Sequence, residues 1–315
     1  TPGTSEIFRY DPGDVVQTYP SPGGHFLVHY VLGGHNGVPM ADLDGSGVPD
    51  HVESVASIYD DVLAFYQGML GYRAPLSDAM LTDNGGDGRF DVYLLDFGGS
   101  ADGSFRTDGC ALFGARIGQC VGFMDQENDF FGYGYPSIDY ANRLLASHEF
   151  FHAVQAAYDS TQGSVLAEGT AVWASGRFDS SLRDVEAFAD GYFSMTGRPI
   201  DSPPVGPVPA FAYGSSIFFQ FLAERFGDDV IRLLWEAADT TPWMMAIDGV
   251  LAMDGSSFTA AWREFAGWNL FTDVRADAAH YANGARYPLV TTTAVTLPYA
   301  TSTPLRVFYA SAQYF

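Results

Sequence analysis

The sequence has 315 residues, of which 47% are hydrophobic and 15% aromatic, enough to bury a substantial core in one large domain or two medium ones. Its 38 acidic and 15 basic residues give a formal charge of -23, which disfavours nucleic acid and anionic membranes as partners and favours cations as ligands. No apolar stretch is long enough to predict a membrane-spanning helix.

The N-terminal part begins with irregular sequence and then shows strand and helix patterns. Residues 1–24 are rich in Pro, Gly and Asp and predict an extended arm, and the start TPGTSEIF lacks the basic and apolar regions of a signal peptide, as in a mature chain. Residues 25–32 (HFLVHYVL) and 90–97 (FDVYLLDF) have the composition of strands. Between them, apolar residues recur at three- and four-residue spacing from His51 to about Gly68, which predicts an amphipathic helix.

Residues 98–136 form a long connection that is rich in Gly and aromatic residues, with a predicted strand at 120–125 (CVGFMD). It contains both cysteines of the chain, Cys110 and Cys120. A disulfide between them would close a short loop and stabilise the fold by roughly 3 kcal/mol. The alternative is a pair of buried free thiols. Together with the calcium-loop pattern described below, the spacing favours a disulfide and therefore an oxidising compartment.

The C-terminal half is predicted to be mainly helical. A helix capped by Ser137 or Asp139 should run to about Tyr158, and a second should cover 165–175. Three further helices are expected at 213–227, 228–238 and 256–271, each with Gly or Asp at its ends. After Gly284 the sequence becomes rich in Thr, Val, Pro and Tyr, which predicts a short β-rich tail.

The motif His148-Glu149-Phe150-Phe151-His152 lies inside the helix predicted to end near Tyr158. Residues four apart share one face of a helix, so the two imidazoles can bind one zinc ion with the carboxylate of Glu149 beside them. Zinc lowers the pKa of a bound water to about 7, and Glu149 is placed to act as the general base. The alternative is two histidines held by local hydrogen bonds.

A catalytic zinc needs a third protein ligand and one open position. A histidine six residues after His152 is excluded, because that residue is Tyr158 and the Gly that such a site needs at 155 is Gln155. Glu168, in the next predicted helix, is the best candidate, since a turn near 161–164 would fold that helix back toward the histidines. Asp159 is the competitor, at a helix end where an acid is usually solvated.

These motifs carry a resemblance to a family. The pairing of HEFFH with a glutamate in the following helix resembles the gluzincins, which are zincin metallopeptidases with glutamate as the third zinc ligand. Over roughly residues 25–275 the chain is similar to secreted metalloproteases of myxobacteria and related bacteria. The segments that carry this similarity are ADLDGSGVPDHVE, GGDGRFDVYLLD, SHEFFHAVQ, AEGTAVW, YGSSIFFQFLAERFG and FAGWNLFT.

The resemblance implies an α+β zincin-like fold, with a mixed sheet over the active-site helix followed by a mainly helical lower half. It also implies His148, His152 and Glu168 as zinc ligands and Glu149 as base. Zincins commonly supply a Tyr or His to stabilise the oxyanion, which makes Tyr213 a candidate and His280 a weaker one. The chain departs from the best-known gluzincins at Ala167 and Val172, where those enzymes have Asn and Asp, so the residues that orient the ligands are unassigned.

Two acidic segments predict structural calcium ions. The first has oxygen donors at positions 1, 3, 5, 7, 9 and 12 of a twelve-residue loop with Gly at position 6, which is the spacing of an EF-hand-like loop. Its predicted ligands are Asp42, Asp44, Ser46, Val48 (through its carbonyl), Asp50 and Glu53. The second segment fits no fixed template, and its predicted ligands are Asp83, Asp87 and Asp91. In either segment the alternative is a solvated acidic turn.

The expected organisation is an arm at 1–24, an upper subdomain at 25–160 with the sheet, the calcium loop and the HExxH helix, a helical lower subdomain at 161–284 with the third ligand, and a β-rich segment at 285–315. The expected function is that of a secreted, monomeric zinc endopeptidase that cleaves proteins or peptides. One alternative is a non-catalytic calcium-dependent surface or binding protein with a structural zinc. The other is a zinc hydrolase of non-peptide bonds.

Overall fold

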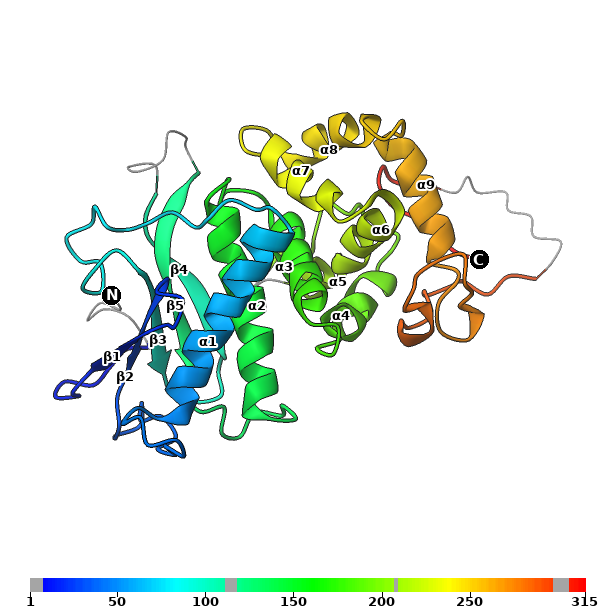
Figure 1. The fold of residues 1–315 in the computed structure, drawn as a ribbon. Coiled ribbons are helices and arrows are strands. Elements are labelled where there is room, and N and C mark those ends of the chain that lie inside the picture. The colour runs from blue at the N-terminus through cyan, green and yellow to red at the C-terminus, as the bar shows by residue number, and fades with distance from the viewer. Residues whose placement is uncertain (1–7, 111–117, 207–208, 297–305) are drawn as a thin grey trace. The chain divides into compact units, whose positions relative to one another are not determined.

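The computed structural model describes residues 8–110, 118–206, 209–296 and 306–315 (Figure 1). Contacts within the chain divide it into two compact units, Thr1–Thr161 and Gln162–Phe315. The division falls next to the boundary at 160/161 that the sequence predicts. Each unit has its own buried apolar residues and is described by itself.

The first unit is built on a five-stranded mixed sheet with the strand order β1-β2-β3-β5-β4. Its two central pairs, β2 with β3 and β3 with β5, are parallel, whereas β1 and β4 are antiparallel edge strands. The strands are β1 (Gln17–Pro20), β2 (Phe26–Tyr30), β3 (Phe90–Leu95), β4 (Gly103–Cys110) and β5 (Cys120–Glu127). The chain is therefore α+β, as expected, with the central strands β2, β3 and β5 at the predicted positions.

Two edge strands lie where the sequence predicted none. Strand β1 falls inside the expected arm, where Gln17–Pro20 pairs with Leu27–Tyr30 of β2. Strand β4 falls inside the expected long connection and pairs along its length with β5. Cys110 and Cys120 face each other in this register and form a disulfide, which confirms the predicted bridge at the ends of β4 and β5.

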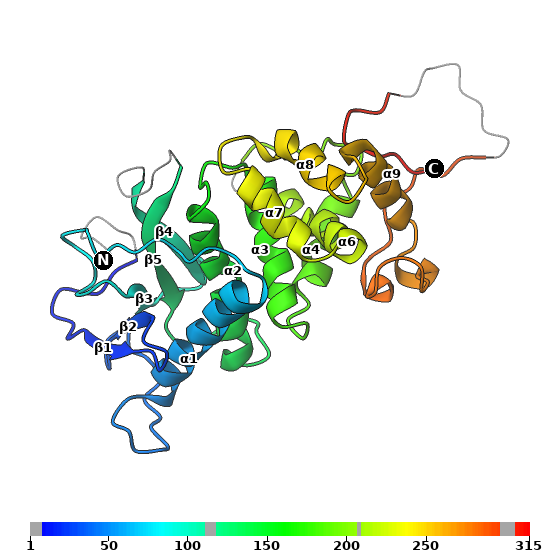
Figure 2. The ribbon, with the colours of Figure 1, turned by 45° about the horizontal axis from the view of Figure 1, so that its top comes forward.

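Two helices, α1 (Asp50–Ala64) and α2 (Ile138–Ala156), lie side by side against the sheet (Figures 1 and 2). Helix α1 follows the predicted apolar spacing and continues as a π-helical turn, Phe65–Met69. The interior beneath the helices is aromatic, because the ring of Phe150 on α2 contacts those of Phe26 and Phe90 at 5.1 and 5.2 Å between centroids. These contacts fix the rotation of α2 against the sheet.

Polar side chains buried under the helices are hydrogen bonded to one another. The Tyr59 hydroxyl of α1 donates to Gln126 Oε1 of β5, and Gln126 Nε2 donates to Asn142 Oδ1 of α2, at 3.0 and 2.7 Å. The Tyr66 hydroxyl donates to the carbonyl of Ser147 at 2.6 Å. Buried polar groups are costly unless they are paired, so this chain of bonds sets the register between α1, β5 and α2.

The second unit is helical. Four of its helices, α3 (Ser164–Phe178), α6 (Ser216–Phe226), α7 (Asp229–Ala237) and α9 (Phe258–Trp268), lie where the sequence predicts helices. The sequence prediction missed α4 (Asp184–Phe193) and α8 (Trp243–Ala252), and it merged the short α5 (Ala210–Gly214) with α6. The core is again aromatic, with Phe218 and Phe265 rings 5.1 Å apart. None of the described helices is long and apolar enough to cross a membrane.

The strands predicted after Gly284 are absent from the described residues of that segment, 287–296 and 306–315. The rest of the predicted tail, 297–305, lies outside the described residues. The segment is held by separate backbone hydrogen bonds, such as those from Thr291 N to Phe193 O and from Thr293 N to Tyr314 O. A composition typical of strands therefore does not produce a sheet here, because the described backbone offers no partner strand.

Candidate metal centre

Helix α2 presents His148 and His152 on one face, one turn apart. The helix begins at a capped end, where Ser137 Oγ accepts a hydrogen bond from the backbone N of Tyr140 at 3.1 Å. The two imidazole rings are 5.2 Å apart between centroids and nearly perpendicular, at 82°. His148 is buried and His152 partly buried, so both rings are positioned by the interior of the first unit. The predicted histidine pair is thus assembled on one helix face.

Glu149 lies between the two imidazoles. Its carboxylate oxygens are 4.0 Å from His148 Nε2 and 4.0 Å from His152 Nε2. The charge of Glu149 also acts on Tyr59. Burial raises the pKa of the Tyr59 hydroxyl well above its ordinary value, and the nearby Glu149 carboxylate raises it further. A carboxylate in this position is close to both nitrogens that can bind a metal, as the role of general base requires.

Gln155 orients one of the histidines, which the sequence did not predict. Its Oε1 atom lies 2.8 Å from His152 Nδ1, and its side chain is buried. Since an amide oxygen only accepts, Nδ1 carries the proton and Nε2 keeps its lone pair for a metal ion. The only sequence signal is the three-residue spacing from His152, which places the two side chains on neighbouring positions of α2.

The third predicted ligand, Glu168, lies on α3. A nitrogen of His148, a nitrogen of His152 and a carboxylate oxygen of Glu168 all lie within 4.8 Å of one another. Within the second unit α3 is held closely, because a Cβ at Gly169 would lie 2.5 Å from Ser215 Oγ. The indole N of Trp235 also donates to Thr170 Oγ1 at 3.1 Å. Because Gly169 and Thr170 directly follow Glu168, these contacts fix the rotation of α3 and therefore the direction in which Glu168 leaves the helix.

The competing acid, Asp159, has a different role. It is buried, and not solvated as the sequence argument assumed. Its Oδ1 atom accepts hydrogen bonds from the backbone N and the hydroxyl of Thr161, at 2.9 and 2.6 Å. Its carboxylate therefore caps the turn that follows α2, and Asp159 is not a member of the metal-binding group around His148.

The two candidates for oxyanion stabilisation are both in the second unit. Tyr213, on the short helix α5, stacks its ring on Phe188 with 5.0 Å between centroids. His280 stacks on Phe271 at 3.8 Å, and its Nδ1 atom lies 2.6 Å from Asp277 Oδ1. His280 is thus already hydrogen bonded to an exposed carboxylate, which makes it the weaker candidate for binding an oxyanion. The role of Tyr213 stays a prediction.

The first acidic loop brings together three of its predicted ligands. Oxygen atoms of Asp42, Asp44 and Asp50 lie within 4.8 Å of one another, and Glu53, in the first turn of α1, is not in this group. The Asp42 carboxylate accepts backbone hydrogen bonds from residues 45, 46 and 47 at 2.9 to 3.1 Å. Ser46 Oγ lies 3.2 Å from the Val48 carbonyl, so both lie on the same side of the turn.

The second acidic segment differs from its prediction. Among the described residues, no metal-binding group contains Asp83, Asp87 or Asp91. Asp87 is captured by Arg89, two residues later, through contacts of 2.5 to 3.1 Å that lower the pKa of its carboxyl. Asp91 is instead buried and lies 2.7 Å from His29 Nε2. A basic neighbour that the sequence argument ignored thus removes Asp87 from the expected site.

No family model matches the sequence, and no curated protein matches it. Function is therefore inferred from the residues of the site and from their geometry.

Proposed function

We propose that the chain is a secreted bacterial zinc endopeptidase of the zincin type. The observation that carries the proposal is the grouping of one ligand atom each from His148, His152 and Glu168 within 4.8 Å. Glu149, 4.0 Å from both imidazole nitrogens, adds the acid–base group that such a site needs.

The donor set fits zinc. Two imidazoles and one carboxylate are the ligands of many catalytic zinc sites, which keep a fourth position open for water or substrate. Gln155 Oε1 accepts a hydrogen bond from His152 Nδ1–H, which leaves Nε2 as the atom that can bind the metal ion. The group contains no fourth Cys, His, Asp or Glu among the described residues, which is the pattern of a catalytic site more than of a closed structural one.

Zinc, when bound, supplies a Lewis acid that polarises the substrate carbonyl and lowers the pKa of water. Glu149 accepts the proton of the attacking water and delivers it to the leaving amine, so no acyl-enzyme forms. Tyr213 is the candidate donor to the oxygen that becomes negative during this step.

The edge strand β4 favours a peptide as substrate. Among the described strands it pairs only with β5, and its other edge could offer backbone groups to an extended chain. The strand lies against α2, since a Cβ at Gly103 would be 2.8 Å from the side chain of Leu145, one turn before His148. A substrate that extends the sheet along β4 would therefore run beside the helix that carries the histidines.

The loop of Asp42, Asp44 and Asp50 would bind a structural calcium ion. This loop leads directly into α1, so an ion would fix the start of the helix against which α2 packs. The disulfide and the calcium loop both suit extracellular fluid. We expect a monomer that acts on protein or peptide substrates and does not bind nucleic acid.

The test combines metal analysis with a cleavage assay on casein. The wild type should contain zinc, cleave casein, lose cleavage in a zinc chelator and regain it with added zinc. Glu149→Gln should keep zinc and lose cleavage, because only the base is removed. Glu264→Gln is the matched control, since Glu264 forms a surface pair with Arg225 that contributes little, and it should leave both readouts unchanged.

The alternatives predict different outcomes. Zinc content without cleavage of casein or of any peptide library would favour a binding protein. Cleavage of ester or non-peptide amide panels in place of casein would favour another zinc hydrolase. Full activity of Glu149→Gln would contradict the assigned mechanism.

A further inference from the structure

Two buried aspartates outside the zinc site each have an oxygen without a hydrogen-bond partner among the described residues. Asp78 is 5% exposed and Asp91 is 1% exposed. The atoms concerned are Asp78 Oδ1 and Asp91 Oδ2. Burying an ionised carboxylate without a partner is costly, so two such groups in one small region need a physical explanation.

Both carboxylates border the same Gly-rich turn. A Cβ at Gly85 would lie 2.0 Å from Asp91 Oδ2, so the turn closes directly over this oxygen. On the other side, Ser77 Oγ donates to the carbonyl of Gly88 at 3.3 Å, which ties the segment of Asp78 to the turn. Gly85 and Gly86 both have positive φ, 69° and 125°, which favours glycine at these positions.

The region around Asp78 and Asp91 is acidic, and its carboxylates repel one another. Burial, followed by repulsion from Asp91, raises the pKa of Asp78 to about 6. Burial also raises the pKa of Asp91, although His29 binds its other oxygen. Burial and the charges of Asp83 and Asp91 raise the pKa of Asp108 on β4.

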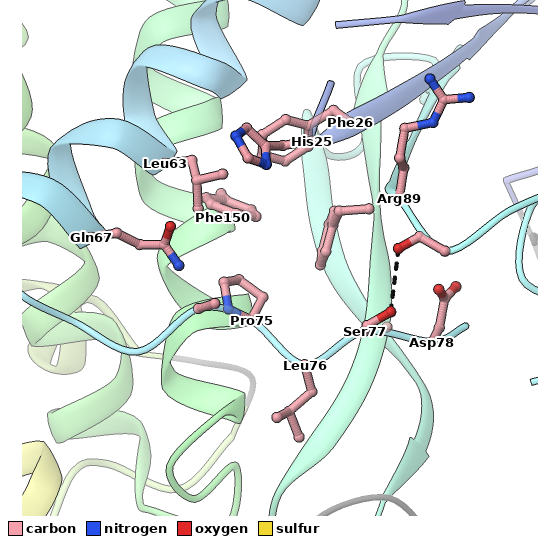
Figure 3. Close-up of a pocket in the computed structure, with 14 residues that line it drawn as sticks. His25, Phe26, Leu63, Gln67, Pro75, Leu76, Ser77, Asp78, Arg89 and Phe150 are labelled. Atoms are coloured by element: carbon pink, nitrogen blue, oxygen red, sulfur yellow. Dashed lines mark hydrogen bonds between the residues drawn. The ribbon is translucent and has the colours of Figure 1, made fainter. Parts of the chain in front are cut away.

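Arg89, directly after this turn, does not supply the missing positive charge. Arg89 binds both carboxylate oxygens of Asp87 through its Nε and Nη2 atoms. In Figure 3 its guanidinium points away from Asp78.

We propose that Asp78 and Asp91 bind a calcium ion against the turn 83–88, with backbone carbonyls and water completing its oxygen shell. Hard oxygen donors from carboxylates and a Gly-rich turn are the ligands that calcium prefers. The net charge of -23 adds a general attraction for cations.

A route from solvent to this site exists. Asp78 lines a cavity of about 310 Å³ in the first unit, together with Ser77, Gly88 and Arg89 (Figure 3). An ion and its water can reach the carboxylate through this cavity, which a buried metal site requires. The site shares only Asp91 with the predicted set of Asp83, Asp87 and Asp91, and it does not depend on zinc or on peptidase activity.

The test is calorimetric titration of chelator-treated, full-length protein with calcium. The background is Asp42→Asn/Asp44→Asn, which disables the first loop. This background should bind one calcium ion per chain, and adding Asp78→Asn should abolish binding or weaken it by about tenfold or more. Asp254→Asn, which neutralises an exposed aspartate in the second unit, should change nothing. A parallel titration with magnesium should show weaker binding, because the site does not impose an octahedral shell.

Thermal unfolding gives a second readout that separates a ligand from a merely structural residue. In chelator, Asp78→Asn should melt at the same temperature as the background or higher, because a buried unpaired charge is removed. In calcium the order should reverse, since only the background gains from the ion. Absence of calcium binding in the background, unchanged binding in Asp78→Asn, or no reversal of the melting order would each overturn the proposal.

Discussion

His152 Nδ1 lies 2.8 Å from Oε1 of Gln155, three residues further along α2. This contact decides which imidazole nitrogen can bind a metal ion, because the nitrogen that donates to an amide oxygen cannot be the ligand atom. It also holds the ring at the angle that brings Nε2 to 4.0 Å from Glu149. Gln155, which lies outside the HExxH motif, therefore sets the tautomer and the orientation of one of the two histidines.

Gln155→Ala should weaken zinc binding by about 10- to 100-fold, as loss of an outer hydrogen bond to a ligand does in other zinc sites. The measurement is zinc release to a chromogenic chelator, with kcat determined at saturating zinc. Gln155→Glu keeps an acceptor for Nδ1–H and should restore affinity. Equal zinc affinity in Gln155→Ala and the wild type would show that the hydrogen bond has no such role.

Glu168 and Asp159 can be distinguished by their effects on zinc and on stability. Glu168→Gln should reduce zinc affinity by at least about 100-fold, because it removes a ligand charge, with little change in unfolding. Asp159→Ala should keep zinc but cost about 1 to 3 kcal/mol, since Thr161 loses its buried acceptor. Urea unfolding and zinc analysis of the two variants test this. The reverse pattern would make Asp159 the ligand.

The helices that carry the proposed site could be predicted from the sequence. The Ser137 cap and the apolar spacing define α2, and the motif spacing alone places His148 and His152 on one face. The strands β2, β3 and β5 are buried and apolar enough to be recognised. Local signals are sufficient for these elements because each is long or strongly apolar.

The rest depends on partners distant in sequence. Strand β4 has a mixed, partly exposed sequence and exists because β5 pairs with it. The tail after Gly284 shows the opposite case, because strand-like composition without a partner in the described residues gives irregular backbone. The capture of Asp87 by Arg89 and the orientation of Gln155 depend on side-chain conformations, which residue spacing does not reveal.

The disulfide should contribute measurably to stability. Replacing Cys110 and Cys120 together by Ser should lower the free energy of unfolding by about 3 kcal/mol or less, the chain-entropy value for a loop of this length. The effect should be seen in denaturant midpoints of the oxidised protein and should vanish when both proteins are compared under reducing conditions. Because β4 borders α2, casein cleavage should fall as well if the edge strand binds substrate. A midpoint unchanged by the double substitution would mean that the loop ends are held by the β4–β5 pairing alone.

His51 makes the first unit sensitive to acid. It lies at the start of α1, directly after the acidic loop, and is only 8% exposed. Its Nε2 atom has no hydrogen-bond partner among the described residues. Burial lowers the pKa of its imidazole to about 4, although the charge of Asp129 and a hydrogen bond that the ring donates to the backbone of Asn128 act in the opposite direction. The folded protein therefore holds His51 neutral.

Because the folded pKa of about 4 is below the ordinary 6.5, the unfolded chain takes up the proton first as the pH falls. The stability that neutral His51 contributes is complete above pH 6.5 and is lost between there and about pH 4, by roughly 3 kcal/mol. Asp78 acts oppositely, since its raised pKa favours the folded state on acidification. The measurement compares the urea midpoint of His51→Gln with that of the wild type across this pH range.

The variant should lose less stability on acidification than the wild type. The control His35→Gln, at an exposed histidine paired with Asp11, should follow the wild type. Parallel pH profiles for His51→Gln and the wild type would show that His51 is protonated equally in the folded and unfolded chains.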